Sequence, residues 1–105
     1  MITAEFYHKN GQLAGFRFIG HSDVSEAGTD IVCAAVSSAA YLAANTITEI
    51  IGVPADILVE DGIMSFKIPL GRAPECGAVL KGLRLHLAGL QEQYPTNIQI
   101  TDTEV

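Results

Sequence analysis

The chain has 105 residues, 49% hydrophobic and 17% charged, and twelve acidic against six basic side chains give a formal charge of −6. This length predicts one domain over residues 1–105 with a single core, which excludes a second domain or a large cofactor cradle. The acidic balance disfavours nucleic acid as a direct partner, because phosphate binding needs clustered Lys and Arg. A basic protein partner suits such a surface better.

The chain contains two cysteines, Cys33 and Cys76. A single pair is not a disulfide framework, and neither residue belongs to a C-x-x-C motif, so both are expected as reduced thiols. The amino terminus lacks the basic start and apolar run of a secretory signal, and no unbroken apolar run reaches about 18 residues. We therefore expect a soluble, cytoplasmic protein with no membrane contact.

Two strands are expected first, near residues 2–8 and 12–20, because apolar residues alternate on both sides of Asn10-Gly11. Asn-Gly between alternating runs is typical of a type I′ hairpin turn. The segment 20–29 is small and polar with glycines at both ends. It is expected to be a surface loop that can move.

A helix is expected over residues 30–51, because apolar residues recur there at intervals of three and four. Gly52 and Pro54 end the pattern. Asp30 is a suitable N-cap, which would place Cys33 in the first helical turn. The expected apolar face comprises Val32, Val36, Ala39, Ala43, Ile47 and Ile50.

A second hairpin is expected over residues 57–68, with another type I′ signal at Asp61-Gly62. A second amphipathic helix begins just after Pro74, and residues 97–103 form a closing strand. The resulting order is ββαββαβ. It predicts an α+β fold with two layers, in which a mostly antiparallel sheet is covered on one face by two helices.

One stretch, residues 20–37, combines a nucleophile, a base, glycines and a helix start. A thiol attacks carbonyl carbon as the thiolate, which a nearby imidazolium or a helix N-terminus favours. His21 at a strand end and Cys33 in the next helix are joined by a loop short enough to bring the ring to the sulfur. Free N–H groups at the helix start would suit an oxyanion. The competing interpretation makes Cys33 a small core residue.

Ser37 lies four residues after Cys33 and therefore on the same helix face. Its hydroxyl would bond either His21 or its own i−4 carbonyl, and the sequence leaves both open. A zinc site from His21, Cys33 and Cys76 lacks the short repeated spacings of such sites. No phosphate-binding glycine motif occurs, so we expect no metal and no cofactor.

Gly20-His21, Gly28 and the run Asp-Ile-Val-Cys-Ala-Ala-Val-Ser over residues 30–37 resemble the ribosomal-processing cysteine proteases of the Prp, or YsxB-like, family. The resemblance covers essentially the whole chain, including the late Gln-Tyr-Pro and the final Ile-x-Ile. The His-loop-Cys motif is its specific part. The family usually has Ala after the His, where this chain has Ser22, a change between small residues.

The resemblance implies a homodimeric cysteine endopeptidase acting on the large-subunit ribosomal protein numbered twenty-seven. It would remove an aromatic-rich amino-terminal extension that ends in Phe-Phe-Ala. Cys33 would be the nucleophile and His21 the general base and proton donor. Asp30 and Ser37 match positions beside this dyad and are candidates for supporting it, and loop 22–28 would cover the substrate. Which acidic residue orients the imidazole stays open.

A hypothesis from a different class also stays open. It is a non-catalytic, ribosome-associated binding module in which Cys33 is a core or redox-sensitive residue. A third option is a dimeric scaffold that uses the apolar helix faces. The three differ in whether the protein cleaves a peptide bond and in whether Cys33 reacts with an alkylating agent.

Overall fold

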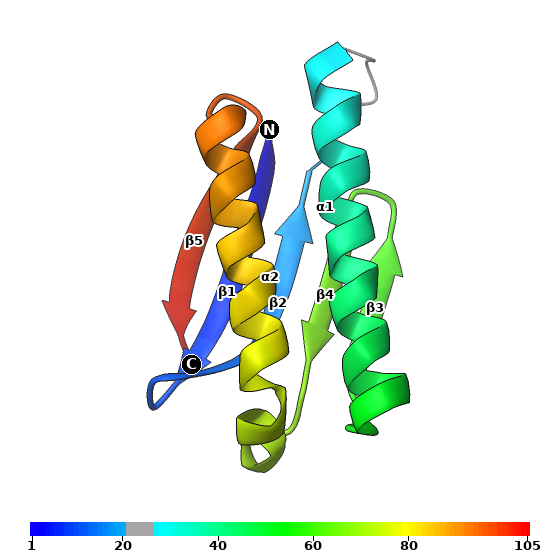
Figure 1. Cartoon of the computed structure of the whole chain (residues 1–105), viewed down its shortest axis with the longest axis vertical. Helices are drawn as coiled ribbons and strands as arrows, with labels where there is room; N and C mark the ends of the chain where they lie inside the picture. Colours follow the sequence, from blue (N-terminus) through cyan, green and yellow to red (C-terminus); the bar gives the residue numbers. More distant parts are fainter. Residues whose placement is uncertain (21–26) are drawn as a thin grey trace.

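The structure is a computed structural model that describes the backbone of residues 1–20 and 27–105 and the side chains of residues 1–20 and 31–105. Two helices lie on one face of a five-stranded sheet (Figure 1), which confirms the predicted ββαββαβ order and two-layer architecture. The elements are β1 (Ile2–Lys9), β2 (Gln12–Ile19), α1 (Ala27–Asn45) continued by a π-helical segment (Thr46–Ile51), β3 (Asp56–Glu60), β4 (Ile63–Lys67), a short 3₁₀ turn (Leu70–Arg72), α2 (Ala73–Gln93) and β5 (Ile98–Glu104).

The strand order in the sheet is β3-β4-β2-β1-β5, and only the β1–β5 pair is parallel. The first hairpin turn has the predicted type I′ signature, with φ of 52° at Asn10 and 78° at Gly11. The second type I′ prediction is wrong, because Gly62 has a φ of 76° but Asp61 does not adopt a positive φ. This turn has one left-handed position, and Gly62 alone supplies it.

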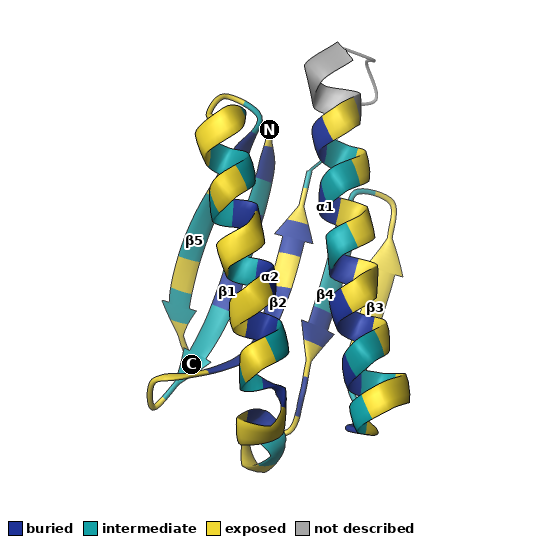
Figure 2. Cartoon of the chain, in the orientation of Figure 1, coloured by how far each residue is buried: buried dark blue, intermediate teal, exposed yellow. Residues whose placement is uncertain are grey.

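Four phenylalanines form the centre of the core between the sheet and the helices. Phe16 stacks on Phe18 with ring centroids 4.5 Å apart and on Phe66 at 5.2 Å, and Phe6 meets Phe18 edge-on at 5.8 Å. All four side chains are buried. Figure 2 shows that the inner faces of both helices are buried while their outer faces are exposed. The inner face of the sheet therefore carries an aromatic layer that packs beneath the helices.

Helix α1 begins at Ala27, one turn before the predicted start. Asp30 is therefore not the N-cap, and Cys33 lies in the second turn instead of the first. No proline interrupts residues 27–30, so a weak capping preference does not prevent the earlier start. The N–H groups without an intrahelical partner lie at the very start of the helix, so the Cys33 amide in the second turn is not one of them and is not free for an oxyanion.

The predicted apolar face of α1 is correct as far as Ile47 and wrong at Ile50. Ile47 is buried, whereas Ile50 is 80% exposed. Thr46–Ile51 is π-helical, and a π turn takes more residues than an α turn. A spacing of three residues therefore no longer returns a side chain to the same face.

The helical stretch Ile31–Ile51 has the length and apolar composition of a membrane-spanning helix, with a mean hydropathy of 1.5. The core helix of a soluble protein meets the same criteria, so length and composition alone are weak support for a span. Here Val32, Val36 and Ala40 on one side of the stretch are buried in the core. This is the pattern of a helix that covers a sheet.

An ion-pair cluster ties α2 to the edge strand β5. Arg84 donates to Asp102 through Nε to Oδ1 at 2.9 Å and through Nη2 to Oδ2 at 2.5 Å. Nε2 of His8, on β1, lies 2.6 Å from Oδ1 of the same carboxylate. The bond from Arg84, followed by that from His8, lowers the pKa of Asp102 from 3.8 to about 2. His8 thus has a structural position, in line with its strand pattern.

Asp102→Asn is expected to flatten the acid limb of the stability curve. A carboxyl with a lowered folded-state pKa stabilises the fold above its unfolded pKa near 4, and this contribution disappears as the pH falls toward 2. The side chain is 40% exposed, so water screens the pairs and the effect is below about 1 kcal/mol. Urea unfolding between pH 5 and 2 measures it. Equal pH dependence in parent and variant would contradict the assignment.

Candidate active site

Cys33 occupies a fixed position at the border between core and solvent. It is half-buried and packs against the hydrophobic core, while its neighbours Val32 and Val36 are buried and hold α1 on the sheet. Cys76, in contrast, is fully buried within α2. Burial raises the pKa of the Cys76 thiol, and Glu75 adds to the shift. Cys76 is therefore the inert core cysteine of the pair.

The Cys33 side chain opens into a pocket of about 360 Å³. The pocket lies between α1, the end of β2 and the β3–β4 hairpin, which are neighbours in Figure 1. Its walls are mostly apolar, with one serine and one carboxylate. The lining residues are Ile2, Phe18, Gly20, Cys33, Ala34, Val36, Ser37, Ala40, Tyr41, Val59, Glu60, Gly62, Ile63 and Met64.

The structure brings three of the predicted site residues to one pocket: Gly20, Cys33 and Ser37. Ser37 is exposed and follows Cys33 by one helical turn on the same wall. His21 and Ser22 lie outside the described residues, as does most of the predicted loop 22–28. Gly28 and Asp30, which were expected before or at the helix start, belong to the backbone of the first turn of α1.

Gly20 ends the sheet immediately before His21. Its N–H donates to the carbonyl oxygen of Gly62 at 2.8 Å, and its φ is +96°. A Cβ at this position would lie 2.5 Å from the carbonyl oxygen of Met1. Both observations require glycine here. Gly20 thus fixes where the chain leaves the sheet toward His21.

Gly20→Ala is expected to destabilise the fold by about 1–3 kcal/mol, because it adds a backbone clash to a strained φ. Urea unfolding measures the loss. Gly89→Ala is the matched control, since a Cβ there meets nothing within 4 Å and Ala is the better helix former. The control should be as stable as the parent or slightly more so. A Gly20→Ala protein of parental stability would contradict this account of the strand end.

A family sequence model described as cysteine protease Prp matches residues 1–99. The chain belongs to the cysteine protease Prp family. A curated relative, the ribosomal processing cysteine protease Prp of Bacillus subtilis (strain 168), is 28% identical over 100 residues, which cover 90% of this chain and 88% of the relative. The resemblance inferred from the His-loop-Cys motif is confirmed at the level of the family.

Solved Prp structures share the fold over nearly the whole chain. The essential ribosomal processing protease Prp from S. aureus, in complex with a substrate peptide, is 25% identical with a TM-score of 0.89, covering 98% of this chain and 100% of that one. The same protease with a covalently linked product peptide is 26% identical with a TM-score of 0.86, at the same coverage. A Streptococcus mutans protein, 23% identical with a TM-score of 0.90, covers 100% of this chain and 99% of its own and shows the fold alone.

A Prp-family protease needs a thiol that a substrate carbonyl can reach. Cys33 meets this requirement because it lines an open pocket, and the buried Cys76 does not. Among the residues whose side chains are described, no three His, Cys, Asp or Glu gather in a way that would hold a metal ion.

Several residues that line the pocket could not be assigned to it from the sequence pattern. Tyr41 lines it from α1, and Val59 and Met64 line it from the second hairpin. Tyr41 follows Cys33 by eight residues, which is close to two helical turns, so the spacing carried a signal. Val59 carried none, because an apolar residue in a strand is normally read as core.

Proposed function

We propose that this protein is a site-specific cysteine endopeptidase that removes the amino-terminal extension of the large-subunit ribosomal protein numbered twenty-seven during ribosome assembly. The observation that carries the proposal is the placement of Cys33 in an open pocket while Cys76 is buried, in a chain of the Prp family. The B. subtilis relative and the S. aureus protein are ribosomal processing proteases, which supports the same class of substrate.

The proposed reaction uses a Cys33–His21 dyad. His21 accepts the thiol proton, and Cys33 Sγ attacks the carbonyl carbon of the alanine that ends the Phe-Phe-Ala sequence. The tetrahedral intermediate collapses when His21 gives its proton to the leaving amine, which leaves a thioester on Cys33. Water activated by His21 then releases the extension and restores the thiol. The covalently linked product peptide of the S. aureus protease supports such a covalent route.

The remaining roles follow the family motif. Asp30 and Ser37 are proposed to support the dyad, and the presence of Ser37 in the lining of the Cys33 pocket supports its part in this proposal. Residues 22–28 are proposed to cover the bound peptide. A ribosomal protein is basic, and the charge of −6 favours its approach to this chain. We further propose that the reaction takes place in the cytoplasm without a cofactor, a nucleic-acid contact or a membrane.

Intact-mass spectrometry of the purified protein incubated with the extended ribosomal protein tests the proposed function. The expected result is one cut after Phe-Phe-Ala, with the trimmed ribosomal protein as an uncut control. The competing binding module predicts a complex in which the substrate keeps its full mass. An extended substrate that stays intact with folded protein would therefore favour the binding module and contradict the protease.

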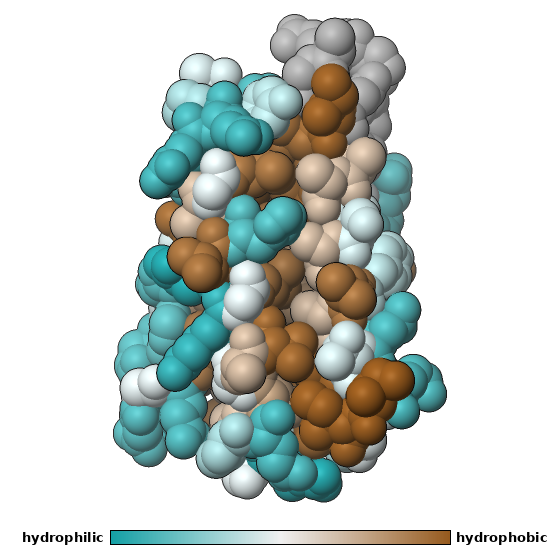
Figure 3. Space-filling model, viewed as in Figure 1, coloured by the Kyte–Doolittle hydropathy of each residue, from teal (hydrophilic) through white to brown (hydrophobic). Residues whose placement is uncertain are grey.

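We also propose that the chain is a homodimer formed through its helical layer. A groove of about 610 Å³ runs between α1 and α2, and Leu42, which lines it, is 71% exposed. Figure 3 shows an apolar patch on this face, over the carboxyl-terminal part of the α1 and π-helical stretch, where Ile50 is also exposed. Apolar surface of this kind supports burial against a second copy.

Leu42→Glu is expected to convert the dimer into a monomer, because the substitution places a charge in the apolar groove. Sedimentation velocity of the parent should give twice the chain mass, and that of the variant the chain mass. Leu85→Glu is the control, since Leu85 is an exposed leucine of α2 that does not line the groove. A monomeric parent, or an equal effect of both variants, would contradict this interface.

A further inference from the structure

Strand β3 is an edge strand with an apolar composition. It is the first strand in the sheet order, and within the described residues no strand pairs with its outer side. Ile57, Leu58 and Val59 are all exposed hydrophobic residues, and most of β3 has the colour of exposed residues in Figure 2. Proteins usually protect such an edge, because its free N–H and C=O groups pair readily with another extended chain.

The pairing of β4 with β2 determines which β3 groups are free. The N–H of Ile68 donates to the carbonyl oxygen of Ala14 at 3.0 Å, and the N–H of Gly20 donates to that of Gly62 at 2.8 Å. Backbone groups along a strand point to alternate sides. The even-numbered residues of β4 therefore direct their N–H and C=O groups toward β2, and the odd-numbered residues direct theirs toward β3.

The odd-numbered residues of β4 are opposite Asp56, Leu58 and Glu60 in the register of the hairpin. These three residues direct their backbone groups toward β4. Ile57 and Val59 must then direct their N–H and C=O groups to the open edge. Val59 also lines the pocket into which Cys33 opens, so the free edge and the thiol belong to one continuous site.

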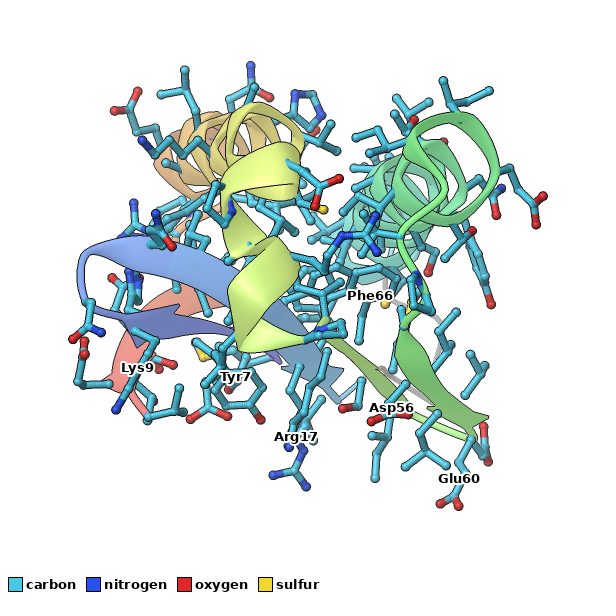
Figure 4. The ribbon with its side chains drawn as sticks, turned by 90° about the horizontal axis from the view of Figure 1, so that it is seen from below. Tyr7, Lys9, Arg17, Asp56, Glu60 and Phe66 are labelled. Atoms are coloured by element: carbon cyan, nitrogen blue, oxygen red, sulfur yellow. The ribbon has the colours of Figure 1, made fainter. Side chains whose placement is uncertain are left out.

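The side chains beside this edge differ between the two faces of the sheet. Ile57 is opposite Phe66 in the hairpin, and Phe66 is buried beneath the helices, so the Ile57 side chain projects to the helix side. Val59, two residues further along β3 and opposite Met64, projects to the same side. Val59 is 54% exposed and shares the pocket with the half-exposed Tyr41. Asp56 and Glu60 project to the opposite face (Figure 4). The helix side therefore offers apolar contacts, and the opposite face offers two carboxylates with the exposed Leu58 between them.

We propose that β3 binds the substrate by accepting an extended segment of it as an additional strand, an inference that rests on the proposed function. The peptide main chain pairs with Ile57 and Val59. Alternate peptide side chains, apolar or aromatic, pack on Tyr41 and Val59, and the intervening ones, basic or polar, face Asp56 and Glu60. Main-chain pairing places the peptide beside Cys33, and the two faces select its side chains. Val59 and Tyr41 are thus specificity-determining residues.

Peptide binding to a Cys33→Ala background tests the inference separately from cleavage. The probe is a fluorescent synthetic peptide that spans the Phe-Phe-Ala cleavage site, and anisotropy measures its Kd. A series of peptides, each with one N-methyl group, should lose affinity about tenfold at every second position, because only alternate N–H groups pair with the edge. The intervening positions are the internal control. A loss without this alternation would overturn the inference.

Variants at Val59 test the protein side of the pairing. Val59→Pro removes an N–H that faces the open edge and should raise the Kd about tenfold, whereas Val59→Ala keeps the N–H and should raise it less than threefold. Equal Kd values for the two variants would overturn the inference. So would a Val59→Pro protein that loses self-association but keeps its Kd, because the edge would then pair with a second copy.

The N-methyl series decides the question if Val59→Pro does not fold. A parent that binds in alternation but cleaves nothing would overturn only the proposed function.

Discussion

Replacing Cys33 by alanine is expected to reduce cleavage of the extended ribosomal protein to background, a loss on the order of 10⁴-fold or more. Without the thiol no thioester forms, and no other cysteine can substitute, because Cys76 is buried in α2. His21→Ala is expected to reduce cleavage by about 10²–10⁴-fold, the usual contribution of a general base and acid. Single-turnover assays with mass spectrometry measure both losses.

The same experiment requires that both variants remain folded. Cys33 is half-buried and borders a pocket, so the alanine leaves no sealed cavity, and circular dichroism and urea unfolding should match the parent closely. Cys76→Ala is the matched control for cysteine loss, with cleavage retained at temperatures where the variant is folded. Near-parental cleavage by Cys33→Ala or His21→Ala would contradict the dyad.

Phe16→Ala is expected to have the largest effect on stability, a loss of about 3–5 kcal/mol. Phe16 is fully buried, stacks between Phe18 and Phe66 and meets Phe6 at a tilt, so the truncation removes three ring contacts and leaves a cavity at the centre of the core. A domain of this size has about 5–15 kcal/mol in total. The variant should therefore be close to unfolding at 37 °C, as measured by urea or thermal denaturation.

Phe16→Leu separates the loss of volume from the loss of ring stacking. It keeps most of the apolar volume and should cost less than half as much as the alanine variant. Its cleavage activity should stay near the parental value at 25 °C, since Phe16 does not line the pocket. If Phe16→Ala lowers the free energy of unfolding by less than about 1 kcal/mol, the aromatic layer does not hold the sheet and the helices together.

The order and faces of most elements could be predicted from the sequence because the local signals agree with the tertiary packing. Asn10-Gly11 specifies its turn, and the alternation of Ile2, Ala4 and Phe6 identifies the buried face of β1. The ends of elements were less predictable. A capping preference at Asp30 is worth about 1 kcal/mol, which tertiary packing readily outweighs, and α1 begins one turn earlier.

The lining of the candidate site could be predicted only in part, and its dyad chemistry stays a prediction. The motif predicted a helical thiol, and Cys33, Ser37 and Gly20 do share a pocket. Val59 could not have been assigned to that pocket from sequence, because its exposure depends on the strand order, which places β3 at the edge of the sheet. Whether an apolar strand residue belongs to the core or to an exposed edge can be decided only when the neighbouring strands are known.

Alkylation with iodoacetamide at pH 7, mapped by peptide mass spectrometry, tests most directly whether Cys33 is the nucleophile. We expect Cys33 to be modified first, Cys76 to stay unmodified in the folded protein, and cleavage to fall in proportion to the modified fraction of Cys33. Protein in which Cys33 is fully modified while the extended ribosomal protein is still cleaved at the parental rate would contradict the assignment of Cys33 as the nucleophile.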